Sequence, residues 1–368
     1  MATLSSSITR KPQARSNHPV STPFLEWLVA LTGLLFVAGI FFDGWAHNHG
    51  RVDDSFFTIY HAVMYSAYGI SALLFAGLQM FNVNKGYRWS HALPAGYMLG
   101  MVGVGIFAVG GFGDMLWHTA FGIEENLEAL MSPTHLLLGM GAFLIAGTPF
   151  RSAWQRRDAV QGWKDLLPMI VSAIGMLSIL TFFTQYTYFT IDTTGLIGRR
   201  PYGLRGLEDI FGIMAFLMPS AFITGFLLLM LRRWRLPFGS ITFILLANAL
   251  LMTIMDLETE GTDEYALVLA LLVGGFLVSG LILDSFVRWL KPSAEREGWL
   301  RVFAALAPAL LCLSMLGGLQ LLGTLAGVGG LWWAIHMWMG LPTIAAIGGL
   351  LLSYLMLPPA IPEVGDVA

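Results

Sequence analysis

Charged residues are scarce in this chain. Asp, Glu, Lys and Arg make up 12% of the 368 residues, hydrophobic residues make up 56%, and the mean hydropathy is +0.70. So little polar surface cannot cover a water-soluble globule of this size. The composition therefore predicts an integral membrane protein.

Cysteine and concentrated positive charge are also missing. The single Cys312 lies in an apolar segment without a second cysteine, which excludes an intramolecular disulfide and a cysteine-based zinc site. The net charge is −3, and no basic surface typical of nucleic-acid binding is predicted. We therefore expect the lipid bilayer as a partner, and no nucleic acid.

Long apolar runs, by contrast, recur along most of the chain. A helix needs about 20 residues to cross roughly 30 Å of hydrocarbon. Ten such runs predict an all-α, polytopic membrane protein with about ten transmembrane helices. Their approximate ranges are 24–42, 56–81, 90–110, 132–149, 165–185, 207–231, 237–255, 265–287, 299–322 and 330–356.

The distribution of Lys and Arg predicts the orientation, because basic residues near short loops stay on the cytoplasmic side of a membrane. Of the 20 Lys and Arg residues, 16 fall on one side, and the other side holds Arg51, Arg199, Arg200 and Arg205. Both termini are therefore predicted to be cytoplasmic, as tails at 1–23 and 357–368, in the plasma (inner) membrane.

Histidine and aspartate gather in two segments on the predicted outer side. One of them reads "GDMLWHTAFGIEENLEALMSPTHLLLGMG" over 113–141, and its charged residues are all acidic. In each segment an Asp ends one helix, a Trp and a His follow within four residues, and a second His opens the next helix. The helix pairs 24–81 and 90–149 are therefore predicted to be a weak repeat. They form a four-helix half, 24–149, ahead of a six-helix remainder, 165–356.

The spacing within each segment suits a metal site. Residues i and i+4 lie on one face of a helix, so Asp114 and His118 can point at one ion, and His135 supplies a third ligand. Ser132, at the predicted N-cap, and Pro133 fix where the helix of His135 begins. Two imidazoles and one carboxylate are compatible with copper, zinc or non-haem iron and leave a coordination position open.

The earlier segment offers the same ligand types in Asp43, His47 and His61, with His49 as a candidate fourth ligand. Whether the two sets form one metal site or two is left open by the sequence.

Other interpretations of these residues stay open. The outer histidines could be interfacial polar groups beside tryptophans, with their carboxylates merely solvated. His61 and His135 could instead form a bis-histidine haem pair. Glu128 lies on a short interfacial helical stretch, where it is either a solvated residue or a candidate catalytic proton acceptor.

Asp114, Trp117, His118 and the "SPTH" segment ending at His135 resemble the metal motif in the C subunit of the copper membrane monooxygenases. This is the particulate methane and ammonia monooxygenase family, and the match covers about 25 residues. The resemblance implies that Asp114, His118 and His135 bind copper. It also implies monooxygenase-like oxidoreductase activity on an apolar substrate, with an electron donor and other membrane subunits as partners.

Two further function classes fit the same residues. A metal-handling or transport protein would capture an ion with the outer ligands, and would need polar residues through the bilayer. Few are found, chiefly Gln185, Asn248 and Gln320. A zinc-dependent membrane hydrolase would use metal-bound water, with Glu128 or an Asp as base.

Overall fold

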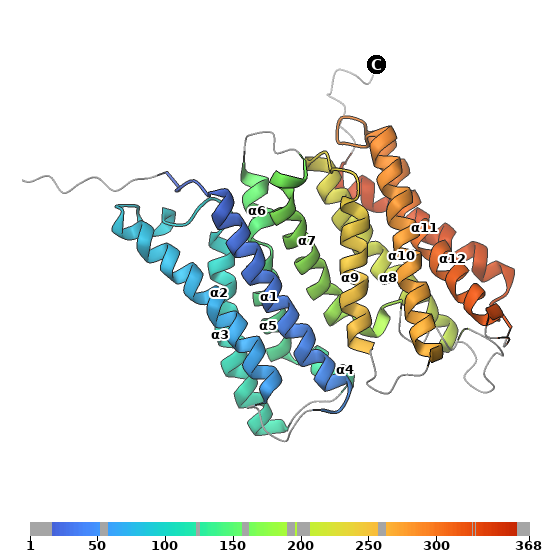
Figure 1. Cartoon of the computed structure of the whole chain (residues 1–368), viewed down its shortest axis with the longest axis horizontal. Helices are drawn as coiled ribbons and strands as arrows, with labels where there is room; N and C mark the ends of the chain where they lie inside the picture. Colours follow the sequence, from blue (N-terminus) through green and yellow to red (C-terminus); the bar gives the residue numbers. More distant parts are fainter. Residues whose placement is uncertain are drawn as a thin grey trace, which may run out of the picture.

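The computed structural model describes residues 17–51, 58–122, 126–156, 162–189, 196, 207–256, 263–325, 327 and 329–358 (Figure 1). Most of the predicted tails at 1–23 and 357–368 lies outside these residues. Within them the chain is helical and contains no β-strand. The α-helices are α1 (Pro23–Asn48), α2 (Ile59–Asn84), α3 (Met98–Phe121), α4 (Asn126–Met131), α5 (Pro133–Ala146), α6 (Thr148–Gln155), α7 (Trp163–Phe183), α8 (Leu207–Arg233), α9 (Ser240–Asp256), α10 (Asp263–Leu290), α11 (Glu297–Leu325) and α12 (Ile335–Met356), with short 3₁₀ helices η1 (Trp89–His91) and η2 (Gln185–Thr187).

The described helices have the length and composition of a multi-pass membrane protein. Eight of them are long and apolar enough to cross a bilayer, or nine spans if the bent pair α5 and α6 counts as one. Helix α9 is apolar but shorter. Large hydrophobic side chains such as Leu73, Phe112 and Leu351 point outward, as expected of helices that face lipid.

The helices form a slab that runs from α2 and α3 at one edge to α11 and α12 at the other (Figure 1). Helix α7 is the most deeply buried of the long helices and packs against α1, α5 and α9. The helices α1, α2, α3 and α5 lie together at the blue and cyan end of the chain, so the Asp and His residues of the two predicted segments belong to one part of the fold.

Small residues allow the closest contact of this region, between α3 and α5. A Cβ atom at Gly103 would lie 2.7 Å from the carbonyl oxygen of Gly141, and one at Gly141 would lie 2.7 Å from the backbone nitrogen of Phe107. The two backbones therefore touch, which is typical of helix pairs in lipid. This contact fixes α5, and the histidine at its start, against α3.

Each of the ten predicted ranges contains a helix, but several helix ends were wrong, chiefly in the first and third helices. The third helix was expected at 90–110 and extends over Met98–Phe121 instead, because Pro94 and Gly96, which has a positive φ of 89°, break the chain ahead of it. The first helix was expected to end near 42 and continues to Asn48. As a result Asp114 and Asp43 lie inside helices, one turn before His118 and His47.

Candidate metal centre

Asp114, His118 and His135 converge into one cluster, which we call the second group. The Nε2 atom of His118 lies 3.4 Å from Oδ2 of Asp114, and Nε2 of His135 lies 3.4 Å from Oδ1. One ligand atom from each residue lies within 4.8 Å of the other two. The aspartate side chain is 1% exposed, so this carboxylate is withdrawn from water.

These separations suit a shared metal ion better than direct hydrogen bonds. Hydrogen bonds between nitrogen and oxygen cluster at about 2.7–3.2 Å. Two ligands held about 2.1 Å from one ion at a tetrahedral angle are separated by about 3.4 Å. Nε2 of His118 and Nε2 of His135 each lie at this distance from one oxygen of the carboxylate, His118 from Oδ2 and His135 from Oδ1. The donor set therefore fits a cation bound between the three side chains.

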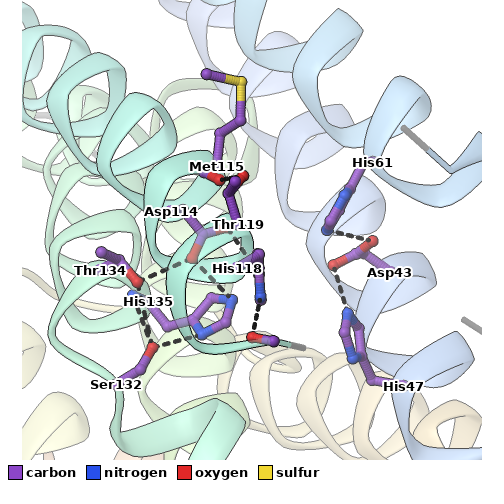
Figure 2. Close-up of polar contacts among 11 residues, drawn as sticks. Asp43, His47, His61, Asp114, Met115, His118, Thr119, Ser132, Thr134 and His135 are labelled. Atoms are coloured by element: carbon purple, nitrogen blue, oxygen red, sulfur yellow. Dashed lines mark hydrogen bonds and ion pairs between the residues drawn. The ribbon is translucent and has the colours of Figure 1, made fainter. Parts of the chain in front are cut away.

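A chain of hydrogen bonds orients the ligands of the second group (Figure 2). Nδ1 of His135 lies 2.7 Å from Oγ of Ser132, which lies 3.3 Å from Oγ1 of Thr134, and Thr134 donates to Oδ1 of Asp114 at 2.9 Å. Since the carboxylate can only accept, the chain is satisfied when each group donates towards it. His135 then carries its proton on Nδ1, and the lone pair of its Nε2 is available to bind a cation beside Asp114.

His118 is fixed in the same way. Its Nδ1 lies 3.3 Å from the carbonyl oxygen of Gly122, which only accepts, so Nδ1 donates and Nε2 keeps its lone pair. Gly122 caps α3 with a φ of 89°, a conformation that favours glycine. Hydrogen bonds to the outer ring nitrogen are typical of metal-binding histidines.

Asp43, His47 and His61 form a second cluster, which we call the first group. His61 Nε2 lies 3.5 Å from Oδ1 of Asp43, and His47 Nε2 lies 3.9 Å from Oδ2. These three residues also offer ligand atoms within 4.8 Å of one another. Their carboxylate is more open, because the Asp43 side chain is 14% exposed.

In both groups a helix N-cap residue fixes the position of the later histidine. Thr58 caps α2 by accepting a hydrogen bond from the His61 amide at 3.1 Å, and Ser132 caps α5 by accepting one from the His135 amide at 3.4 Å. Each cap lies three residues before its histidine, so both imidazoles project from the first turn of a helix. The predicted roles of Ser132 and Pro133 at the start of α5 are confirmed.

Both groups open into one cavity. It is lined by all three residues of the first group and by Asp114 and His135 of the second. Its volume is about 90 Å³. The other walls are largely apolar and include Ile40, Met64, Phe107, Leu138, Phe182 and Phe183.

The remaining predicted site residues lie outside the two groups. His49 forms the C-cap of α1, where its ring stacks on Trp45 and its Nδ1 lies 2.8 Å from the Trp45 carbonyl oxygen. Glu128 is exposed on α4 and lines a separate surface depression beside Trp117. His61 and His135, the predicted haem pair, each lie against a carboxylate of their own group, which a haem would have to displace.

The sequence predictions did not assign a role to Thr134 or to the amide pair at the cavity wall. Thr134 donates to the Asp114 carboxylate, and Asn48 donates to Gln185 at 2.8 Å, where both residues line the cavity. A hydroxyl residue directly before the histidine was the available signal for Thr134. No local signal links Asn48 to Gln185, because they belong to distant parts of the chain.

A comparison with protein-family models finds no match for this chain, and none is found among curated proteins or solved structures.

Proposed function

We propose that this chain is a membrane metalloenzyme of the oxidoreductase class, in which each Asp/His group holds a redox metal ion and a small apolar substrate occupies the cavity between them. Copper is the favoured metal and iron the alternative within this class, whereas zinc, which has no redox chemistry, would fit the hydrolase instead. The proposal includes the resemblance to the C subunit of the copper membrane monooxygenases, with Asp114, His118 and His135 as copper ligands.

The shared cavity is the observation that carries this proposal. Ligands of both groups line it, and apolar side chains from α1, α2, α3, α5 and α7 form most of the remaining wall. An apolar molecule would gain by leaving water for such walls, and it would lie beside both groups. Neither a merely solvated set of outer histidines nor a structural metal would require this arrangement.

The ligand set supports a transition metal rather than Mg²⁺ or Ca²⁺. Each group combines two imidazole nitrogens with one carboxylate oxygen, and imidazole suits copper, iron and zinc. When bound, copper or iron supplies one-electron redox chemistry. The hydrogen bonds to Nδ1 of His118 and His135 keep the Nε2 lone pairs directed at the cation.

The structure gives less support to the two alternative functions. A zinc hydrolase needs a base beside the metal; Glu128 lies on the surface outside the cavity, and the two aspartates that line the cavity, Asp43 and Asp114, are the carboxylate ligands of the two groups. A transporter needs polar groups free to coordinate an ion through the bilayer. The buried Asn248 is instead hydrogen-bonded to Tyr188, Ser178 and Thr181.

We also propose the predicted topology of ten crossings, with both termini in the cytoplasm and the two groups at the outer face of the plasma membrane. The bent pair α5 and α6 and the short α9 would then supply the ninth and tenth crossings. A redox enzyme of this kind requires an electron donor, and other membrane subunits would supply or dock it.

Metal analysis of detergent-purified protein tests the proposal. We expect the wild type to hold two copper ions per chain, and His118→Ala and His135→Ala each to lose one. His336→Ala is the matched control, because His336 is exposed at the start of α12 and should leave the metal content unchanged. Zinc in the wild type would favour hydrolysis. Absence of metal, or full retention in both variants, would rule out the metal centre.

A further inference from the structure

A pair of amide side chains lies at one end of the cavity between the two Asp/His groups. Nδ2 of Asn48 donates to Oε1 of Gln185 at 2.8 Å, and both residues line the cavity. Asn48 is the exposed last residue of α1, whereas Gln185 is 7% exposed and lies in η2, just after α7. Neither residue belongs to a metal group, so the two ligand sets do not account for this pair.

The amide of Gln185 keeps a donor for a molecule in the cavity. An amide side chain carries one acceptor oxygen and one NH2 donor group. Asn48 occupies Oε1, and among the described residues the Nε2 group of Gln185 donates to no acceptor. Buried donors are nearly always paired, whether with protein groups, water or a ligand. Because Gln185 lines the cavity, its partner is a molecule that occupies the cavity.

Two phenylalanines next to Gln185 hold it in place. The ring of Phe182 fills the space that a Cβ atom would take at Gly44, and the ring of Phe183 lies 2.5 Å from where a Cβ would be at Gly139. Each ring therefore packs against a glycine, Phe182 on α1 and Phe183 on α5. With both rings fixed, the chain that leaves α7 has little freedom, and Gln185 keeps its position two residues later.

The cavity changes from polar to apolar along its length. On α1 its lining extends from Asn48 past Asp43 to Ile40, which spans about 12 Å of helix. Met64 on α2 and Phe107 on α3 lie towards the same inner end as Ile40, because each lies one or two helical turns further into the bundle than the metal ligand on its own helix. A molecule that matches this cavity therefore carries a polar group at one end and an apolar chain at the other.

A hydroxyl is the polar group that fits this end of the cavity best. Its oxygen accepts a hydrogen bond from Gln185, and its proton can be donated to a carboxylate oxygen of Asp43 or Asp114, which line the same cavity. A carbonyl group would accept from Gln185 but has no proton to donate. An ammonium group has donors only, so it would leave Nε2 of Gln185 unpaired.

We propose that the substrate is a short-chain alcohol. Its oxygen accepts a hydrogen bond from Nε2 of Gln185, and its carbon chain lies towards Ile40, Met64 and Phe107. Asn48 is a positioning residue, because it holds Oε1 of Gln185 and so directs Nε2. This inference rests on the proposed function in one respect, since it takes the cavity as the substrate site.

Binding of 1-butanol to the purified full-length protein tests the proposal, and saturation-transfer NMR measures the affinity. The comparison ligand is 1-chlorobutane, which has the same carbon chain and no hydroxyl. Gln185→Met keeps the length of the side chain and removes the donor. We expect this variant to weaken 1-butanol binding about fivefold, the loss typical of one hydrogen bond, and to leave 1-chlorobutane binding unchanged.

Asn48→Ala is the second variant, and it keeps the proposal testable if Gln185→Met does not fold, because Asn48 is exposed. It should weaken 1-butanol binding about twofold, since Nε2 of Gln185 is then less well oriented. Gln155→Met is the matched control. It makes the same change at an exposed residue of α6 outside the cavity, and it should affect neither ligand.

Two results would overturn the proposal. Equal weakening of both ligands in Gln185→Met would mean that Gln185 only shapes the wall, and unchanged 1-butanol binding in both variants would leave water as the partner of Nε2. Metal content is measured in the same samples. Either result in a protein that holds its metal ions contradicts the alcohol alone, whereas absence of metal from the wild type contradicts the proposed function.

Discussion

Asp114 in the second group is 1% exposed and accepts a hydrogen bond from Thr134, whereas Asp43 in the first group is 14% exposed. The distances follow the same order. Both histidine nitrogens of the second group lie 3.4 Å from the carboxylate, and those of the first group lie at 3.5 and 3.9 Å. The second group therefore holds the same ligand types as the first group, but in a tighter cluster with a less exposed carboxylate.

The difference originates in the residue before the later histidine. In "SPTH" that residue is Thr134, which donates to the carboxylate. In "TIYH" it is Tyr60, whose ring lies 4.9 Å from that of Phe42. Helix geometry alone brings the three ligands of each group together, and the hydroxyl then decides how firmly the carboxylate is held. We infer that the second group binds its ion more tightly.

The largest expected change in metal affinity comes from removing the carboxylate of each group, Asp114 or Asp43, in turn. Asp114→Ala should lower metal affinity at the second group by about 100-fold or more, since it removes one of three ligands and leaves two imidazoles. Asp43→Ala should cause a smaller loss at the first group, because that carboxylate lies farther from its histidines and, within the described residues, its Oδ1 accepts no hydrogen bond like the one that Thr134 donates to Asp114. Competition with a chelator of known affinity, monitored by the copper absorption, measures both.

The matched control for these variants is Asp165→Ala, which removes an exposed carboxylate near the start of α7. It should leave both affinities unchanged. Equal losses in Asp43→Ala and Asp114→Ala would contradict the inferred difference between the groups.

A smaller effect is expected when only the supporting hydroxyl is removed. Thr134→Val keeps the shape of the side chain but deletes the bond to Asp114 and interrupts the chain to His135. Loss of such a partner costs about 10- to 100-fold in metal affinity. Binding measured at the second group should fall by this amount, with the first group unaffected.

Thr119→Val provides the comparison, because Thr119 lies one residue after His118 and donates to the Met115 carbonyl oxygen, outside the chain of bonds (Figure 2). If Thr119→Val and Thr134→Val weakened binding equally, the chain from His135 to Asp114 would have no special role.

The apolar runs predicted the helices well because the length of a run is itself the physical requirement for crossing a bilayer. The end of α3 was harder to place. Residues 114–121 contain Asp and His, which the hydropathy pattern assigns to a loop, yet no proline or capping residue stops the helix before Gly122. Backbone hydrogen bonding, rather than polarity, decides where that helix ends.

The two ligand groups were predictable because i and i+4 spacing and a capped helix start are local features. The sequence could not show that His49 lies outside the first group. Its position depends on α1 ending at Asn48 and on the His49 ring stacking on Trp45. The shared cavity was also beyond local reasoning. It requires α7 to bring Phe182 and Phe183 next to α1 and α5.

The smallest and most specific effect is a gain, obtained by giving the first group the hydroxyl that it lacks. Tyr60 occupies the position in α2 that Thr134 occupies in α5, one residue before the later histidine and two after the cap. His61 and His135 lie at nearly equal distances from their carboxylates, 3.5 and 3.4 Å, so a threonine at 60 should reach Asp43.

Tyr60→Thr should therefore raise metal affinity at the first group by about threefold to tenfold, the lower part of the range for such partners. Tyr60→Val is the control, because it has the shape of threonine without the hydroxyl and loses the same contact with Phe42. A gain in Tyr60→Thr that Tyr60→Val does not share would show that the hydroxyl, and not the space left by tyrosine, separates the two groups. An equal gain in both variants would instead assign the difference to access of the ion to Asp43.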